Sequence, residues 1–141
     1  MPTMLITGAS GGIGSATALA AARAGWDVAV NFRTNGARAG ELVVQVESDT
    51  GRRAVAIGAD VAIEEEAIAL FDATVAELGS LDCLVNNAGI GPGYGPFVDL
   101  TVADIEATWA TNLTGAFVCA REAVRRMATS RGGHGGSIVN V

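Results

Sequence analysis

Short apolar runs alternate with longer amphipathic stretches along this chain. The runs are mostly rich in Val, Ile or Leu, which is typical of strands buried on both faces. The stretches between them have the spacing of amphipathic helices, and most have a glycine close to the C-terminal end. The pattern predicts strands at Met4–Thr7, Asp27–Phe32, Arg53–Ile57, Cys83–Val85 and Ser137–Val141, and helices at about Gly12–Ala24, Ala37–Thr50, Ile63–Leu78 and Val102–Ser130.

The strict alternation of strands and helices predicts the α/β class. Right-handed crossovers place each helix back over a parallel sheet, so helices should cover both of its faces. No Pro/Ser-rich linker, low-complexity tract or repeat interrupts residues 1–141. We therefore expect a single domain.

The fourth helical stretch is long for a globular helix. Thr101 and Asp104 resemble a capping box, which marks its start, and Gly115 is a candidate for a bend. The apolar residues of this stretch keep roughly helical spacing on one face, so we interpret them as core rather than as a cofactor contact. They are Ile105, Trp109, Leu113, Phe117, Val124 and Met127.

The composition narrows the possible chemistry. All 9 basic residues are arginine, so a Walker-type phosphate loop, a Schiff-base site and a lysine-assisted tyrosine are absent from this sequence. One histidine and two cysteines are too few for a zinc site, and we expect no metal. The net charge of −6 argues against a nucleic-acid partner. Without a charged leader or an apolar stretch of spanning length, we expect a soluble, cytoplasmic protein with no membrane partner.

A glycine-rich turn, TGASGGIG at residues 7–14, follows the first expected strand and leads into the first helix. Its glycines permit a tight turn, close approach of a pyrophosphate and close packing of the helix on the strand. Amide groups at the helix N-terminus would then face the anion. This position favours a nucleotide site over a merely tight turn, and the candidate cofactor-binding residues are Gly8, Ser10, Gly12, Ile13 and Gly14.

The end of the second strand bears on which cofactor binds. Dinucleotide sites that favour the unphosphorylated cofactor have an acidic residue here, on the ribose hydroxyls. This chain has Phe32 followed by Arg33, and an arginine can pair with a 2′-phosphate. The sequence thus favours NADP(H) over NAD(H), the alternative being that Arg33 is an ordinary solvated loop residue.

Two further segments follow strands at the edge where doubly wound sheets bind ligands. Asp60 and Val61 follow the third strand and could flank an adenine ring, although Asp60 is also a candidate N-cap of the next helix. The fourth strand leads directly into Asn87, Ala88 and Gly89, which we take as cofactor-binding, with simple turn chemistry as the alternative.

Taken together, TGASGGIG, Phe32-Arg33, Asp60-Val61 and the NNAG of residues 86–89 resemble short-chain dehydrogenases/reductases of the classical type. The resemblance spans the whole chain. Within the family, the sequence is most similar to glucose/ribitol dehydrogenase-like and 3-oxoacyl-carrier-protein reductase-like members. It implies a Rossmann-type doubly wound parallel sheet with strand order 3-2-1-4-5. It also implies hydride transfer between NADP(H) and a small-molecule carbonyl or secondary alcohol. By the same resemblance Asn112 is the catalytic asparagine, which in the family holds a water in the proton relay.

The chain also departs from the family pattern. Family members carry a serine shortly after the fifth strand and then Tyr-x-x-x-Lys, whereas this sequence reaches Val141 within or just after that strand. Tyr94, the sole tyrosine, has Val98 four residues on and cannot stand in for that pair. A second departure is Gly11, where many NADP-preferring members have a basic residue.

These departures indicate a truncated enzyme that lacks the C-terminal strands and is inactive alone. The full-length form would be a homo-oligomer. The alternative is a non-catalytic NAD(P)-binding or sensor protein, which would need the glycine turn but not Tyr-x-x-x-Lys.

Overall fold

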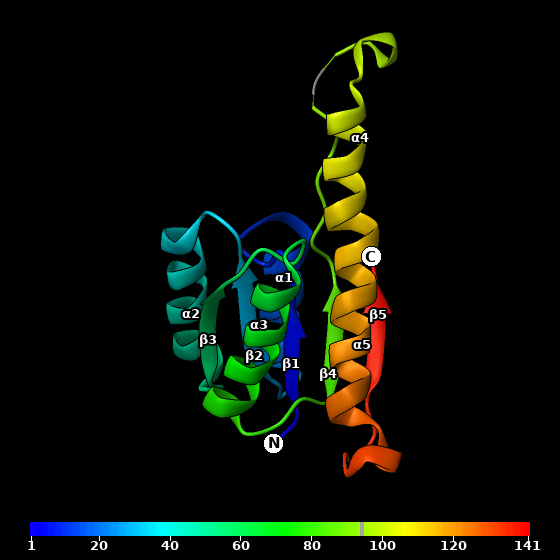
Figure 1. Ribbon diagram of the computed structural model, residues 1–141. Coiled ribbons are helices and arrows are strands. Elements are labelled where there is room, and N and C mark those ends of the chain that lie inside the picture. The colour runs from blue at the N-terminus through cyan, green and yellow to red at the C-terminus, as the bar shows by residue number, and fades with distance from the viewer. Residues whose placement is uncertain (94) are drawn as a thin grey trace.

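A parallel five-stranded sheet forms the centre of the molecule in the computed structural model, which describes residues 1–93 and 95–141 (Figure 1). The expectation for Tyr94 therefore lies outside the described residues. The strands are β1 (Thr3–Ile6), β2 (Asp27–Phe32), β3 (Ala54–Gly58), β4 (Cys83–Asn86) and β5 (Ser137–Asn140). The helices are α1 (Gly12–Arg23), α2 (Gly36–Thr50), α3 (Glu64–Leu78), α4 (Val102–Trp109) and α5 (Ala116–Met127), with short helical turns at Phe97–Asp99, Ala110–Gly115 and Thr129–Arg131.

The strand order is β3-β2-β1-β4-β5, as predicted, and every neighbouring pair is parallel. Each end of an observed strand either agrees with the predicted end or differs from it by one residue. β1, β2 and β4 are almost fully buried, as their apolar runs predict. The expectation of burial on both faces is wrong for β5, which is mostly exposed, and β3 is only partly buried.

Helices cover both faces of the sheet, which confirms the α/β prediction. On one face α1 and α2 pack through small or branched side chains such as Ala18, Ala22 and Leu42. On the other face α3 and α5 pack through Leu70, Phe71 and Ala123 among others. Because all neighbouring strands are parallel, their carboxyl ends lie at one common edge of the sheet.

The fourth predicted helix is interrupted rather than continuous. α4 begins with the predicted capping box, in which Thr101 and Asp104 bond reciprocally. Ala110–Gly115 form a π-helical turn before α5. A Cβ atom at Gly115 would lie 2.9 Å from the Val61 carbonyl oxygen, so glycine lets this turn pass close to the segment after β3. The irregularity expected at Gly115 is thus a π-helical turn with a close backbone contact.

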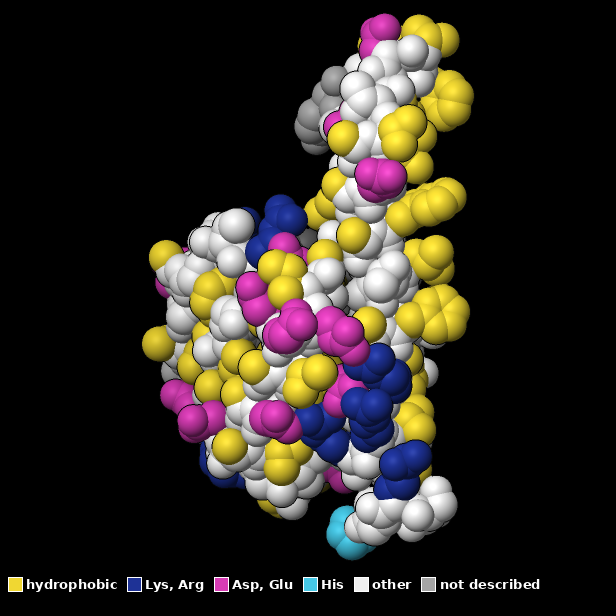
Figure 2. Space-filling model, viewed as in Figure 1, with side chains coloured by type: hydrophobic (Ala, Val, Ile, Leu, Met, Phe, Trp, Pro, Cys, Tyr) yellow, Lys and Arg dark blue, Asp and Glu magenta, His cyan; other side chains and the backbone are white. Residues whose placement is uncertain are grey.

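The interpretation of the apolar set on this helix as core is wrong for five of its six members. Met127 is buried, with 5% of its surface exposed, whereas Trp109 is 61% and Phe117 71% exposed. Helical spacing shows that residues share a face, but not which face meets the sheet. Figure 1 shows α4 projecting beyond the sheet, and Figure 2 shows a row of hydrophobic side chains along the outer edge of this helical column. We call Ile105, Trp109, Leu113, Phe117 and Val124 the exposed stripe.

Candidate functional site

Residues from five segments of the chain meet in a cavity of about 330 Å³ at the carboxyl edge of the sheet. Its lining includes most of the predicted cofactor-binding residues, namely Gly8, Ser10, Arg33, Asp60, Val61, Asn87, Ala88 and Gly89. Asn31, Thr34, Ala59, Ile90 and Thr111 complete the lining. The fold therefore brings together groups that are up to about 100 residues apart in the sequence, at the place where ligands of doubly wound sheets bind.

The glycine turn needs glycine for two physical reasons. Gly8 and Gly12 have positive φ values of 61° and 54°, in the left-handed region that disfavours other residues. A Cβ atom at Gly8 would lie 2.8 Å from the Ala88 Cα atom, and one at Gly14 would lie 2.6 Å from the Asn87 side-chain nitrogen. The turn is thus pressed directly against the segment that follows β4.

The start of α1 lies beside this cavity but does not line it. Gly12, Ile13 and Gly14 form its first residues, and Ile13 is exposed. The N-cap residue, Gly11, has no side chain that could bond the first amide groups, and no acidic residue lies in the first turn. These amide groups are therefore available to an anionic group.

Thr7 and Asn87 hold the glycine turn against the segment after β4. The Thr7 hydroxyl accepts hydrogen bonds from the backbone amides of Asn87 and Ala88, each at 3.0 Å. In return, the Asn87 side-chain amide donates to the carbonyls of Thr7 at 2.9 Å and Gly8 at 3.0 Å. The Asn87 amide group thus positions the turn.

Asn31 fixes the other side of the turn and was missed by the sequence analysis. Its side-chain oxygen accepts a hydrogen bond from the Gly8 amide at 3.1 Å, and its nitrogen donates to the Ala59 carbonyl at 3.0 Å. Only 2% of its surface is exposed. A lone amide within the apolar run DVAVNF was the available signal, because buried polar side chains need specific partners.

Arg33 and Asp60 both lie at the rim of the cavity. The Arg33 side chain is exposed and, within residues 1–93 and 95–141, makes no salt bridge. The Asp60 carboxylate accepts from the Ala62 amide at 2.9 Å, in a local turn. The N-cap residue of α3 is Ile63, so the alternative role of Asp60 as N-cap is wrong.

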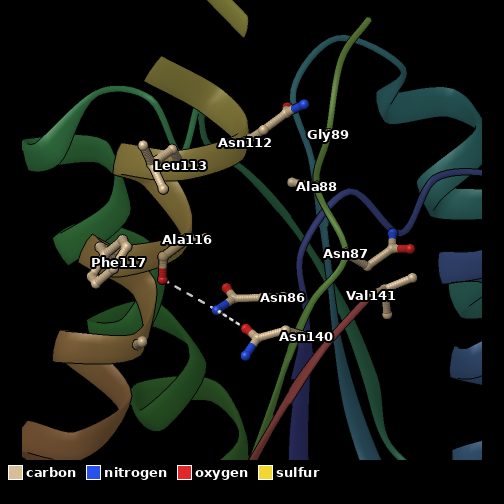
Figure 3. A pocket seen from close by; sticks show the side chains of 11 residues that line it. Asn86, Asn87, Ala88, Gly89, Asn112, Leu113, Ala116, Phe117, Asn140 and Val141 are labelled. Carbon is tan, nitrogen blue, oxygen red and sulfur yellow. Dashed lines mark hydrogen bonds between the residues drawn. The ribbon is translucent and has the colours of Figure 1, made fainter. Parts of the chain in front are cut away.

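A second cavity, of about 400 Å³, shares Asn87, Ala88 and Gly89 with the first (Figure 3). Asn112 reaches it from the π-helical turn, and its side chain bonds both backbone groups of Ile90 at 2.8 Å. On the sheet side, the Asn86 side chain donates to the Ala116 carbonyl and to the Asn140 side chain, each at 3.1 Å. Asn112 therefore ties the segment after Gly89 to the helix above it.

The strongly paired charges lie away from both cavities. Glu122 on α5 is 2% exposed and accepts hydrogen bonds from Arg121, Arg125 and Arg126. Burial by itself would raise the pKa of Glu122, but the hydrogen bonds from Arg126 and Arg121 outweigh it, so this pKa is lowered. Burial and the charge of Glu122 raise the pKa of the Cys119 thiol to about 12, so this cysteine stays protonated.

Asp27, at the opposite end of β2 from the cavity, is also enclosed by arginines. It pairs with Arg52 and Arg53, and these bonds outweigh the effect of burial and lower the pKa of Asp27.

Among residues 1–93 and 95–141, no three His, Cys, Asp or Glu side chains lie close enough together to hold a metal ion. Over the same residues, no helix is long and apolar enough to cross a membrane.

Nearly the whole chain matches one known protein family. A family model described as short chain dehydrogenase matches residues 2–141. This chain belongs to the short-chain dehydrogenase family. The resemblance derived from its motifs is confirmed.

Other short-chain dehydrogenases and related oxidoreductases match over nearly the whole chain. An uncharacterized oxidoreductase, YgfF of Escherichia coli (strain K12), is 43% identical over 141 residues, which are 100% of this chain and 57% of that protein. The L-rhamnose 1-dehydrogenase (NAD(P)(+)) of Sphingomonas sp. (strain SKA58) is 42% identical over 139 residues, 99% of this chain and 53% of the relative. The chain thus spans about half the length of the curated relatives it matches.

One solved structure of a short-chain dehydrogenase is informative about the cofactor. The enzyme from Burkholderia cenocepacia J2315 in complex with NADP is 40% identical and superposes with a TM-score of 0.88, covering 97% of this chain and 53% of that one. It shows that this short-chain dehydrogenase fold accommodates NADP in a similar protein.

Proposed function

We propose that this chain is the NADP(H)-binding part of a short-chain dehydrogenase/reductase that interconverts a carbonyl and a secondary alcohol by hydride transfer. The observation that carries the proposal is the convergence of the glycine turn, Arg33, Asp60-Val61 and residues 87–89 on one cavity. That cavity shares residues with a second one, which Asn112 lines and which has room for a small substrate.

The residues present fit a dinucleotide. The space that a Cβ atom would need is taken up by Ala88 at Gly8 and by the Asn87 side chain and the turn backbone at Gly14, whereas a Cβ atom at Gly12 would meet nothing within 4 Å. The backbone at Gly12 is therefore open to a ligand. Gly8, Ser10, Gly12, Ile13 and Gly14 would hold the pyrophosphate, and Asp60 and Val61 the adenine ring. Asn87, Ala88 and Gly89 would line the path toward the nicotinamide end. When bound, NADP(H) supplies or accepts the hydride.

The chain's own contribution to catalysis is positioning. Asn112 anchors Ile90 through both of its side-chain polar atoms, and in this way orders the wall between the two cavities. Proton transfer to the developing alkoxide needs a donor, which family members provide with Tyr-x-x-x-Lys. Because the sequence contains no lysine, that pair does not lie within these 141 residues.

The preference for NADP(H) rests on Arg33. It lines the cavity at the end of β2, and residues 31–34 contain no acid. A charge-assisted contact to a 2′-phosphate contributes about 1.5–3 kcal/mol, or roughly one to two decades in affinity.

Calorimetric titration of the wild type and of Arg33→Ala with NADPH and NADH tests both the site and the preference. We expect the substitution to weaken NADPH binding selectively. Equal wild-type affinities for the two cofactors would refute the preference, and binding of neither would refute the site.

Reading the gene beyond codon 141 separates the enzyme from the alternative, a non-catalytic NAD(P)-binding or sensor protein. An in-frame serine and Tyr-x-x-x-Lys would support the enzyme, and a genuine stop would support the sensor.

The proposal includes the oligomeric state of the whole protein and the compartment in which it works. The exposed stripe on α4 and α5 gives an apolar face along which a second copy could pack, in keeping with a homo-oligomer. Cys83 and Cys119 are free and buried, which suits a reducing compartment such as the cytoplasm.

A further inference from the structure

Arg38 reaches from α2 to the glycine turn. A Cβ atom built at Gly11 would lie 3.4 Å from the central guanidinium carbon of Arg38 and 3.5 Å from its Nη1 atom. The guanidinium group therefore lies beside Gly11, at the distance where it would contact a side chain there, immediately before the first amide groups of α1. Neighbouring Ser10 lines the cavity, so this group lies at the border of the nucleotide site.

The position of Arg38 is electrostatically unfavourable for the fold itself. It lies in the first turn of α2, where the helix dipole favours negative charge, and that turn contains no acidic residue. Six other arginines form salt bridges, but in the part of the chain that the structure describes Arg38 forms none. A cation without a partner at this place would be stabilised by an anionic ligand.

The backbone that carries Arg38 is held firmly. The Asn35 side chain caps α2 by accepting a hydrogen bond from the Arg38 amide at 3.1 Å. Gly36 packs so closely on the Phe32 ring that a Cβ atom there would come within 3.1 Å of it. The short segment between Arg33 and Arg38 is therefore fixed to the end of β2, and it presents one arginine at each of its ends.

A ribose 2′-phosphate carries a charge of about −1.5 to −2 at neutral pH, more than one exposed arginine neutralises. The carboxylate of Asp60 lines the same cavity and would repel a phosphate, so a second positive charge is needed there. We propose that Arg38 is a second specificity-determining residue, which binds the 2′-phosphate of NADP(H) from the Gly11 side while Arg33 binds it from the end of β2. This inference rests on the proposed function, because it assumes that the cavity holds a dinucleotide.

The test uses adenosine 2′,5′-bisphosphate and ADP as probes, because they differ in the 2′-phosphate and need no catalytic turnover. Both are titrated calorimetrically into the 141-residue chain as wild type, Arg38→Ala and Arg33→Ala. Arg131→Ala is the matched control, since Arg131 is exposed, forms no salt bridge among the described residues and lies outside the cavity. Circular dichroism establishes that each variant is folded.

We expect Arg38→Ala to weaken binding of the bisphosphate by about five- to tenfold, as for an exposed charge-assisted contact, and to leave ADP binding unchanged. The loss should shrink as salt is added, because the contact is ionic. Arg131→Ala should change neither affinity. A selective loss for Arg33→Ala without one for Arg38→Ala overturns the role of Arg38 and leaves the proposed function intact. Equal losses of both probes in Arg38→Ala also overturn it, and a wild type that binds neither probe overturns both proposals.

Discussion

Arginines serve different purposes in two regions of this molecule. Between α3 and α5, Arg121, Arg125 and Arg126 surround the buried carboxylate of Glu122. At the carboxyl edge of the sheet, Arg33 and Arg38 are exposed and, among the described residues, pair with no carboxylate. The charges of the first region are neutralised within the fold, whereas the two arginines at the carboxyl edge remain free to bind an anionic ligand. The first region should therefore govern stability and the second should govern binding.

The largest expected effect is on catalytic activity at the carboxyl edge of the sheet. The 141-residue chain should show no NADPH oxidation above background with ketones, ketoacyl thioesters or aldoses, even when it binds the cofactor. The reason is that hydride transfer to a carbonyl needs a proton donor, and the sequence has no lysine to lower the pKa of a tyrosine. A chain extended through a Tyr-x-x-x-Lys segment is the control, assayed by NADPH absorbance. Turnover by the short chain that disappears in Asn112→Ala would reveal another proton relay.

The next largest effect is on stability. Glu122→Ala should lower the free energy of unfolding by about 2–3 kcal/mol, because it leaves three arginines without their shared carboxylate. Arg33→Ala should change it by less than about 0.5 kcal/mol, as for an exposed side chain. Urea titration followed by circular dichroism measures both. Equal destabilisation by the two substitutions would remove the distinction between the regions.

Acid should act through the paired region. The folded-state pKa of Glu122 lies below its usual value of 4.5, so the stabilisation from this group is complete above that pH. It is lost as the pH falls through the lowered folded-state pKa. Thermal melting of the wild type should therefore shift downward more steeply on acidification than melting of Glu122→Gln, which has no charge at this position. Parallel curves for the two proteins would contradict this role of Glu122.

The smallest effect on stability is expected on the exposed face of α5. Phe117→Ser should change the free energy of unfolding by less than about 0.5 kcal/mol, but reduce self-association, because this side chain is exposed and apolar. Ala123→Asp, on the buried face of the same helix, is the contrasting variant and should destabilise the fold strongly. Sedimentation velocity over a range of concentrations reports the association. A wild-type chain that stays a monodisperse monomer at every concentration would contradict self-association through Phe117.

Much of the fold could be predicted from the sequence because its signals are local. Apolar runs located the strands, and Thr101 with Asp104 located the start of α4. The segments that follow β1, β2, β3 and β4 line one cavity, since parallel strands bring their carboxyl ends to one edge.

What the sequence did not reveal depends on contacts between distant segments. The apolar spacing around Phe117 is the same whether the face is covered or open, so burial could not be derived from it. Asn31 and Arg38 act through the glycine turn, which lies more than 15 residues away from either, and no local pattern shows that they reach it. Asp60 looked like a helix cap because its residue type suits that role, but α3 begins later, after Ile63.

The hydrogen bonds that tie Thr7 and Gly8 of the glycine turn to Asn31 on one side and to Asn87 and Ala88 on the other affect the thermodynamics of ligand binding. They hold this loop from both sides before any ligand arrives. A loop that is already ordered loses little conformational entropy on binding, so more of the contact energy remains as affinity. The amide protons of Gly8, Asn87 and Ala88, all engaged in these bonds, should exchange slowly with solvent even in the ligand-free protein.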